Sequence, residues 1–428
     1  MILPLLSQIY NLKRGLIILY TKLSEAFHTM ENLECVFCQK KYPLDLFYPF
    51  CPECRQPLLF SYPSKRRKFF PAKQGLEKYL DFLPLREINQ NLSLGEGNTP
   101  LLNLNRIQKK LNLSFVLAKN ETTNPTHSFK DRGSAVAIQK AVSRGIERIG
   151  TVSTGNMAAS TAAYGARAGL KTYLLLKEDT SPDKLLSPAF FNPTMVKVQG
   201  DYGQLFRQSY ALGQKLKIYF MNSVDPFRIE GYKVTGFEIF FQLKRQAPQY
   251  IFVPLSSGGH LIGLMRAFLD LKQEGYIQKL PTFVGVQADG CSPLAQAFAQ
   301  RKSKFKRISK AETIAHAISN PDPPGGNLVL KMIRDNKGII MDVSDREILA
   351  SQKMLAEEEG LFCQPASATT LAALLKLSRK LKFKSQARIV LIITGSGLKS
   401  IQALKSLRLN IHQASLSSLE EMMISFLA

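Results

Sequence analysis

Hydrophobic positions along this chain alternate between short continuous runs and stretches that repeat every three or four residues. Residues 149–153 and 172–176 have strand-like runs, and a helical repeat over 158–168 lies between them, preceded by a glycine turn at 154–156. A strand, a turn, a helix and a second strand make a β-α-β unit. The pattern therefore predicts an α/β protein with parallel strands.

The same pattern recurs twice further along the chain. Residues 250–255 are a nearly continuous apolar run that ends in a small polar turn at 256–260, and a helical repeat follows over 261–272. Residues 387–393 form a buried-strand pattern that ends in the turn Thr394-Gly395-Ser396-Gly397. Ligands of open α/β sheets bind beyond the carboxyl ends of the strands. We therefore expect all three turns to lie at the binding site.

One lysine stands where a loop runs into a helix, within Asn124-Pro125-Thr126-His127-Ser128-Phe129-Lys130-Asp131-Arg132-Gly133. Asn-Pro initiates turns, and Ser128 with Asp131 resembles a capping box, so helix is predicted from about residue 130. The positive end of the helix dipole disfavours the protonated amine, and a partly neutral lysine attacks carbonyls. Lys130 is thus a candidate Schiff-base residue, although on this stretch alone a solvated surface lysine is the commoner explanation.

The turn Ser256-Ser257-Gly258-Gly259-His260 is the best candidate phosphate site in the chain. Glycines allow backbone N–H groups to approach an anion, serine hydroxyls add donors, and the following helix contributes its dipole. No Walker lysine follows, and the spacing is not Gly-x-Gly-x-x-Gly, so neither a nucleotide triphosphatase nor a dinucleotide fold is indicated. A tight strand-to-helix turn without a ligand is the alternative.

Four of the six cysteines form two Cys-x-x-Cys pairs, Cys35 with Cys38 and Cys51 with Cys54, twelve residues apart. This spacing favours a structural Zn(II) site of four thiolates, whose metal would supply the folding energy of a module too small to hold itself together by burial. The alternative is free or disulfide-linked thiols. Four thiolates leave no open coordination position, so no catalysis is assigned to the metal.

The chain has 428 residues, a formal charge of +24 and a pI near 9.7, which raises the question of an anionic partner. The basic runs at 65–68 and 301–307 lack interleaved aromatics and are interpreted as solvated surface, so no nucleic-acid partner is expected. No uninterrupted apolar run of about 18 residues is present, which argues against a membrane span. The cysteine usage fits a reducing compartment, and we expect a cytoplasmic protein.

Composition shifts divide the chain into four parts. Residues 1–30 are an amino-terminal extension, interrupted by Lys13-Arg14 and without a cleavage site, and one hypothesis places the native start at Met30. Residues 31–62 hold the cysteine module, 63–84 are a basic linker, and 85–428 are the main body.

These motifs together resemble pyridoxal-phosphate enzymes of fold type II, the tryptophan-synthase β class, and within it the threonine synthase family. The resemblance implies two α/β subdomains around a cofactor cleft, preceded by a zinc-ribbon-like module that some members also have. It covers roughly residues 90–400, in the stretches 95–101, 124–133, 153–160, 222–231, 356–368 and 394–399.

The resemblance assigns roles to the motif residues. Lys130 would hold pyridoxal 5'-phosphate and then move a proton between substrate carbons, and Thr394 would face the pyridine nitrogen and tune the cofactor. Arg228 would bind a leaving phosphate through paired donors, but a salt bridge with Glu230 explains Arg228 equally well. The implied contacts are Lys130, Asn156, Ser256, Ser257, Gly258, Gly259, His260 and Thr394 for the cofactor, and Ser153, Thr154, Gly155, Ser223 and Arg228 for the substrate.

The implied reaction converts O-phosphohomoserine and water to L-threonine and phosphate by γ-elimination and β-addition, in a homodimer. Several residues depart from the family pattern near the substrate: Met157 replaces a usual threonine, Ser257 an asparagine and His127 a glycine, and residues 314–321 also differ. A related β-replacement or lyase reaction, as in cysteate synthase or threonine and serine deaminases, is therefore the second hypothesis. A zinc-ribbon protein that binds nucleic acid is the third, and the presence of Lys130 argues against it.

Overall fold

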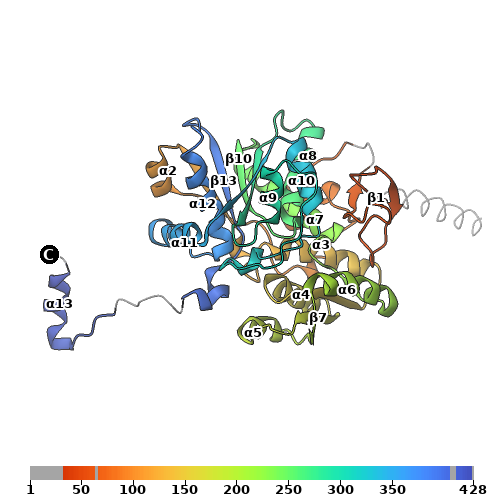
Figure 1. Ribbon diagram of the computed structural model, residues 1–428, viewed down its shortest axis with the longest axis horizontal. Coiled ribbons are helices and arrows are strands. Elements are labelled where there is room, and N and C mark those ends of the chain that lie inside the picture. Colours follow the sequence, from red (N-terminus) through yellow and green to blue (C-terminus); the bar gives the residue numbers. More distant parts are fainter. Residues whose placement is uncertain (1–31, 63–65, 405–410, 427–428) are drawn as a thin grey trace, which may run out of the picture.

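The computed structural model describes residues 32–62, 66–404 and 411–426, so the expectations for residues 1–30 lie outside the described residues. The main body contains two α/β layers, each built on a sheet of mainly parallel strands, and a small antiparallel sheet precedes them (Figure 1). Each strand and helix predicted from the hydrophobic pattern is present, with bounds that differ by at most two residues.

The larger sheet has six strands in the order β12-β11-β10-β13-β5-β4. All neighbours are parallel except β4, which pairs antiparallel with β5 at the edge. Both faces of this sheet are covered by helices, and its strands are correspondingly mostly apolar, with Lys119, Asn120 and Gln287 as buried polar exceptions. The strands are β4 (Leu101–Asn103), β5 (Phe115–Asn120), β10 (Tyr250–Pro254), β11 (Thr282–Ala288), β12 (Ile339–Val343) and β13 (Arg388–Ile393).

The smaller sheet has four parallel strands in the order β8-β7-β6-β9. Its strands are β6 (Arg148–Val152), β7 (Lys171–Lys177), β8 (Thr194–Val198) and β9 (Tyr219–Phe220). The first predicted β-α-β unit lies here, whereas the two later strands belong to the larger sheet. The expected binding turns therefore come from two sheets.

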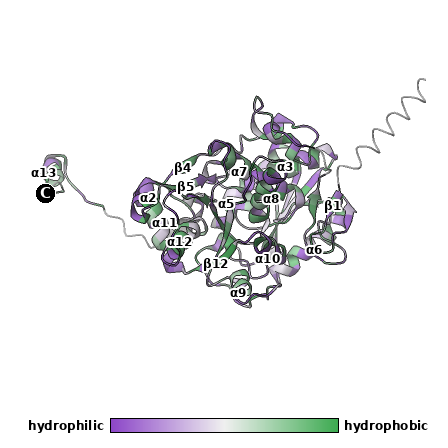
Figure 2. Ribbon diagram, turned by 90° about the horizontal axis from the view of Figure 1, so that it is seen from above, coloured by the Kyte–Doolittle hydropathy of each residue, from purple (hydrophilic) through white to green (hydrophobic). Residues whose placement is uncertain are grey.

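Helices α6 and α11 have one buried face, whereas α3, α7 and α12 are buried along most of their length. Hydrophilic (purple) and hydrophobic (green) residues mix along the helices in Figure 2. The described helices are α2 (Asn105–Leu111), α3 (Lys130–Ser143), α4 (Asn156–Arg167), α5 (Asp183–Ala189), α6 (Tyr202–Leu216), α7 (Pro226–Gln242), α8 (Gly259–Gln273), α9 (Pro293–Ala299), α10 (Gly326–Asp335), α11 (Asp345–Glu359), α12 (Pro365–Ser378) and α13 (Leu419–Ser425), with short 3-10 helices at Gly75–Phe82, Gln90–Leu92, Glu121–Thr123, His316–Ile318, Gly397–Leu404 and Leu416–Ser418.

In the cysteine module, β1 (Asn32–Glu34) pairs antiparallel with β2 (Lys41–Pro43) and β3 (Leu59–Ser61). Its buried residues Leu33, Leu58 and Phe60 belong to the same hydrophobic cluster as residues of α7 and α8. The module therefore packs on the main body and shares its core.

Within the basic run at 65–68, Arg66 and Lys68 are exposed as expected from the sequence, whereas Arg67 is not. Arg67 is 5% exposed and forms salt bridges with Asp270 at 3.1 Å and Glu274 at 2.9 Å. The following residues are also anchored, because Tyr79 and Phe82 of the 3-10 helix are buried beside α7. Sequence composition could not show this, since the carboxylates come from α8 and the residue after it.

Residues 411–426 extend away from the main body and carry α13 (Figure 1). In the described part of the chain, no helix combines the length and apolar character that crossing a membrane requires.

Candidate active site

The loop before Lys130 pairs with the turn after β13. The backbone N–H of Phe129 donates to the carbonyl of Thr394 at 3.1 Å, and the N–H of Ser396 donates to the carbonyl of His127 at 3.0 Å. The helix begins at Lys130 as predicted, but the predicted capping box is wrong, because the capping position is Phe129 and no side chain caps it. Asp131 instead accepts from the N–H and hydroxyl of Thr126, both at 2.6 Å.

Lys130 lies in a setting that favours its neutral amine. Burial lowers the pKa of Lys130, and the nearby positive charge of Arg228 lowers it further, to about 7. Its Nζ lies 4.4 Å from the centre of the Phe129 ring. A lysine with this pKa is substantially unprotonated near neutrality, which a carbonyl nucleophile requires.

Arg228 is fully buried beside this lysine. Its guanidinium donates to Ser134 Oγ at 2.9 Å, to the carbonyl of Lys130 at 3.2 Å, and twice to Tyr232 Oη at 3.2 and 3.3 Å. Four bonds from a group with five N–H donors leave one donor over. The salt bridge with Glu230 considered from the sequence is not formed, because Glu230 pairs with Lys233 and Arg266.

The turn after β10 has the geometry of an anion cradle. Gly258 has a φ of +101°, and a Cβ on Gly259 would lie 2.2 Å from the carbonyl oxygen of Ser223, so neither position accepts a side chain without strain. The first N–H groups of α8 have no intrahelical acceptor, and Ser256 and Ser257 are only half-buried. These donors fit a phosphate group.

His260 closes the cradle. Its ring stacks on Phe129 with centroids 3.8 Å apart, and it is 6% exposed. Neither ring nitrogen has a hydrogen-bond partner among the described residues. Burial and the charges of Lys130 and Arg132 hold the pKa of His260 well below its usual value, so the ring is neutral. Unpaired buried polar atoms indicate room for a polar ligand.

The start of α4 meets the turn after β13. Asn156 Nδ2 donates to Gln364 Oε1 at 2.8 Å, and a Cβ on Gly395 would lie 3.2 Å from that nitrogen and 2.7 Å from the Gln364 oxygen. Ser153 and Thr154 are half-buried and Gly155 is exposed at the amino end of α4. Backbone N–H groups at this end suit a carboxylate.

Two residues of this region received no role from the sequence. Ser367 Oγ accepts the N–H groups of Thr394 and Gly395 at 3.0 and 3.1 Å and lies 3.0 Å from Thr394 Oγ1. Gln364 holds the side chain of Asn156 by accepting a hydrogen bond from its Nδ2. Both lie at the start of α12, within a stretch that resembles the family, and only the tertiary contacts assign them.

The structure shows where the departures from the family pattern lie. His127 has a φ of +59°, which accounts for the usual glycine at this position. Met157 is 6% exposed in the first turn of α4. Ser257 Oγ accepts from Asn320 Nδ2 at 2.9 Å, so two of the departing segments contact each other.

The four cysteines of the module come together as their spacing predicts. All four sulfur atoms lie within 4.8 Å of one another, Cys38 and Cys51 Sγ are 3.7 Å apart, and none is in a disulfide. Tetrahedral coordination at about 2.3 Å would separate sulfurs by roughly 3.8 Å. The donor set therefore fits a four-coordinate metal.

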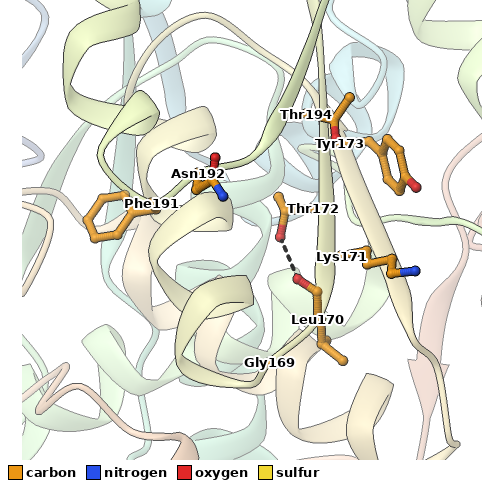
Figure 3. Close-up of a pocket in the computed structure, with 8 residues that line it drawn as sticks. All are labelled: Gly169, Leu170, Lys171, Thr172, Tyr173, Phe191, Asn192 and Thr194. Atoms are coloured by element: carbon orange, nitrogen blue, oxygen red, sulfur yellow. Dashed lines mark hydrogen bonds between the residues drawn. The ribbon is translucent and has the colours of Figure 1, made fainter.

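A separate pocket lies at the amino end of β7, where Thr172 Oγ1 donates to the carbonyl of Leu170 at 3.3 Å (Figure 3). None of the expected site residues lines it. Its lining residues are Gly169, Leu170, Lys171, Thr172, Tyr173, Phe191, Asn192 and Thr194.

Comparison with known proteins agrees with this geometry. Residues 92–395 match the family described as pyridoxal-phosphate dependent enzyme. The chain is 37% identical to a threonine synthase of Methanocaldococcus jannaschii over 86% of this chain and 93% of that protein, and 32% identical to one of Methanosarcina acetivorans over 87% and 93%. Maize serine racemase has the same fold, with a TM-score of 0.60 at 19% identity over 77% of this chain and 93% of that structure.

Proposed function

This chain belongs to the threonine synthase family of pyridoxal-phosphate-dependent enzymes, and we propose that it converts O-phosphohomoserine and water to L-threonine and phosphate. The observation that carries the proposal is the position of Lys130. Its amine has a pKa of about 7, and Phe129 stacks on His260, which closes the phosphate cradle. A nucleophilic lysine and an anion site in contact suit an aldehyde cofactor that carries a phosphate.

Bound pyridoxal phosphate supplies an electron sink for carbanions next to the amino group of a substrate. Ser256, Ser257, Gly258, Gly259 and His260 would hold its phosphate, Asn156 its phenolic oxygen and Thr394 its ring nitrogen. Ser367 and Gln364 keep Thr394 and Asn156 in place. The Nζ of Lys130, neutral at its lowered pKa, would accept a proton from one substrate carbon and return it to another.

The substrate would lie between the two sheets. Ser153, Thr154 and Gly155 would bind its carboxylate with the amino end of α4. Half-buried Ser223 and the remaining donor of Arg228 would take the substrate phosphate. The other contacts of Arg228 hold its charge beside Lys130.

We propose Zn(II) for the four-cysteine site, as a structural metal. The support is the thiolate donor set, with Cys35 and Cys51 fully buried and the sulfurs at tetrahedral spacing. We also propose a cytoplasmic homodimer. Free cysteines suit a reducing compartment, and exposed apolar residues near the edge strand β8, such as Leu186 and Phe190 at 62% and 91% exposure, suit a protein interface.

Phosphate release from purified protein tests the substrate. O-Phosphohomoserine should yield stoichiometric phosphate and threonine, O-phosphoserine should yield little, and Lys130→Ala should yield none with either. Turnover of O-phosphoserine, serine or threonine in place of O-phosphohomoserine would replace the proposal with a related lyase or β-replacement activity.

A further inference from the structure

The chain crosses α7 and α8 as it leaves the cysteine module. We call residues 59–62 and 66–69 the strap. The Phe60 ring lies 4.8 Å from Phe227 on α7, and its carbonyl accepts from Arg266 Nη2 on α8 at 2.8 Å. The Tyr62 hydroxyl donates to Glu230 on α7. The strap therefore contacts both helices.

A buried charge network joins the strap to the helices. It contains three cations and three carboxylates, each side chain with 14% exposure or less. Arg67 is the cation that the strap contributes, and without it the two helices would keep an excess of buried negative charge. Losing one partner of a buried pair leaves the other uncompensated. The members are Arg67, Lys233, Arg266, Glu230, Asp270 and Glu274.

Glycines lock α7 and α8 together. A Cβ on Gly263 would lie 2.6 Å from the carbonyl oxygen of Ile229, and one on Gly236 would lie 2.6 Å from the Cβ of Ala267. The two backbones thus approach closely along their length. Because close-packed interiors transmit strain, we expect a displacement of one helix to act on the other.

Both helices begin at the candidate active site. Arg228 lies in the first turn of α7, and Gly259 opens α8 within the phosphate cradle. Asp270 and Glu274, the partners of Arg67, lie 11 and 15 residues beyond Gly259, which is about 16 and 22 Å at 1.5 Å per residue. Arg266, which binds the strap at Phe60, lies about 10 Å along α8. We propose that the strap positions the α7–α8 pair, and that Tyr62 and Arg67 are positioning residues for the cofactor phosphate site. This inference rests on the proposed pyridoxal-phosphate site.

Equilibrium dialysis of pyridoxal phosphate against the cofactor-free, full-length protein measures the effect. Arg67→Ala should raise the dissociation constant about tenfold or more, the order that loss of outer partners causes at metal sites. Arg67→Lys should recover part of the affinity, because a lysine still pairs with one carboxylate. Lys40→Ala, which removes an exposed ion pair with Glu53 in the same module, is the matched control and should leave the constant unchanged.

A lower melting temperature of Arg67→Ala with an unchanged dissociation constant would overturn the positioning role. If Arg67→Ala fails to fold, Tyr62→Phe decides, because it removes one donor to Glu230 and keeps the ring. An unchanged dissociation constant in Tyr62→Phe would refute the inference without affecting the proposed cofactor site. A wild-type chain that binds no pyridoxal phosphate would instead refute the proposed function, and the inference with it.

Discussion

The lowered pKa of Lys130 has two causes, burial and the positive charge of Arg228. The protein around it removes water, and Arg228 lies close enough for its charge to oppose protonation. Arg228 itself is held by Ser134 and Tyr232. A cation held inside the protein can therefore act on the reaction through the pKa of Lys130.

We expect Arg228→Met to raise the pKa of Lys130 above its wild-type value of about 7, because the opposing charge is gone and only burial still lowers it. The measurement is the pH dependence of labelling of each lysine by an amine reagent in cofactor-free protein. Lys399 is the internal control. Burial lowers its pKa to about 8, and Arg228 is not among the causes. An equal shift of the labelling midpoints of Lys130 and Lys399, or no shift of either, would contradict this electrostatic role of Arg228.

Helix α7 carries a second buried network at its other end. Glu238 accepts from Lys119 at 2.7 Å and from Arg132 at 2.7 and 2.8 Å, and from the N–H of Asn98 at 2.7 Å. Arg132 also pairs with Glu121, whose carboxylate accepts from Asn124 in the lysine loop at 2.9 Å. The network thus connects α7, α3, β5 and the loop before Lys130.

Glu238→Gln should destabilise the fold by about 3–5 kcal/mol at pH 7, since it leaves Lys119 and Arg132 with too little negative charge. Burial acts to raise the pKa of Glu238, but the charges of Arg132 and Lys119 outweigh it and lower the pKa to about 2 from 4.5. The ionised carboxylate therefore stabilises the protein above pH 4.5, and this contribution is lost as the pH falls toward 2.

Urea unfolding at pH 7 and at about pH 3, near the middle of that window, tests both effects. The variant should lose less stability on acidification than the wild type. Glu357→Gln is the control, because its pair with Lys353 is 63% and 73% exposed and its loss should cost less than about 0.5 kcal/mol. A similar cost for both variants would show that Glu238 contributes no buried pairing.

At the scale of the whole molecule, the cysteine module contacts both α/β layers. Phe60 packs on α7, while Phe50 lies 5.3 Å from Tyr210 of α6 in the layer of the smaller sheet. The module thus spans the two layers that enclose the candidate site.

Cys35→Ser should release the metal, because three thiolates and a hydroxyl are a poorer donor set than four thiolates. Protease cleavage should rise within residues 32–61, while the main body keeps the hydrophobic cluster of its larger sheet, which contains no residue of the module. Metal analysis and limited proteolysis measure this, and Cys291→Ser, a buried cysteine outside the module, should retain the metal. Unchanged metal content in Cys35→Ser would refute the four-cysteine site.

The sequence by itself determined the features that depend on neighbouring residues. The alternation of strands and helices, the helix start at Lys130, the glycine turn between β10 and α8 and the four-cysteine cluster all follow from period, turn chemistry and spacing. The capping box was mistaken because Asp131 accepts hydrogen bonds from Thr126 instead, and the Ser128 hydroxyl has no partner among the described residues. Even a local signal can thus be overridden by contacts within a loop.

Only the tertiary structure decided which sheet each strand joins and which charges are buried. Arg67 sits in a run that looks solvated, yet its partners Asp270 and Glu274 are about 200 residues away along the chain. Likewise, Gln364 and Ser367 acquire their roles from Asn156 and Thr394 across the site. A side chain's local sequence specifies its chemistry, but its protonation, burial and partners depend on segments that meet only when the chain folds.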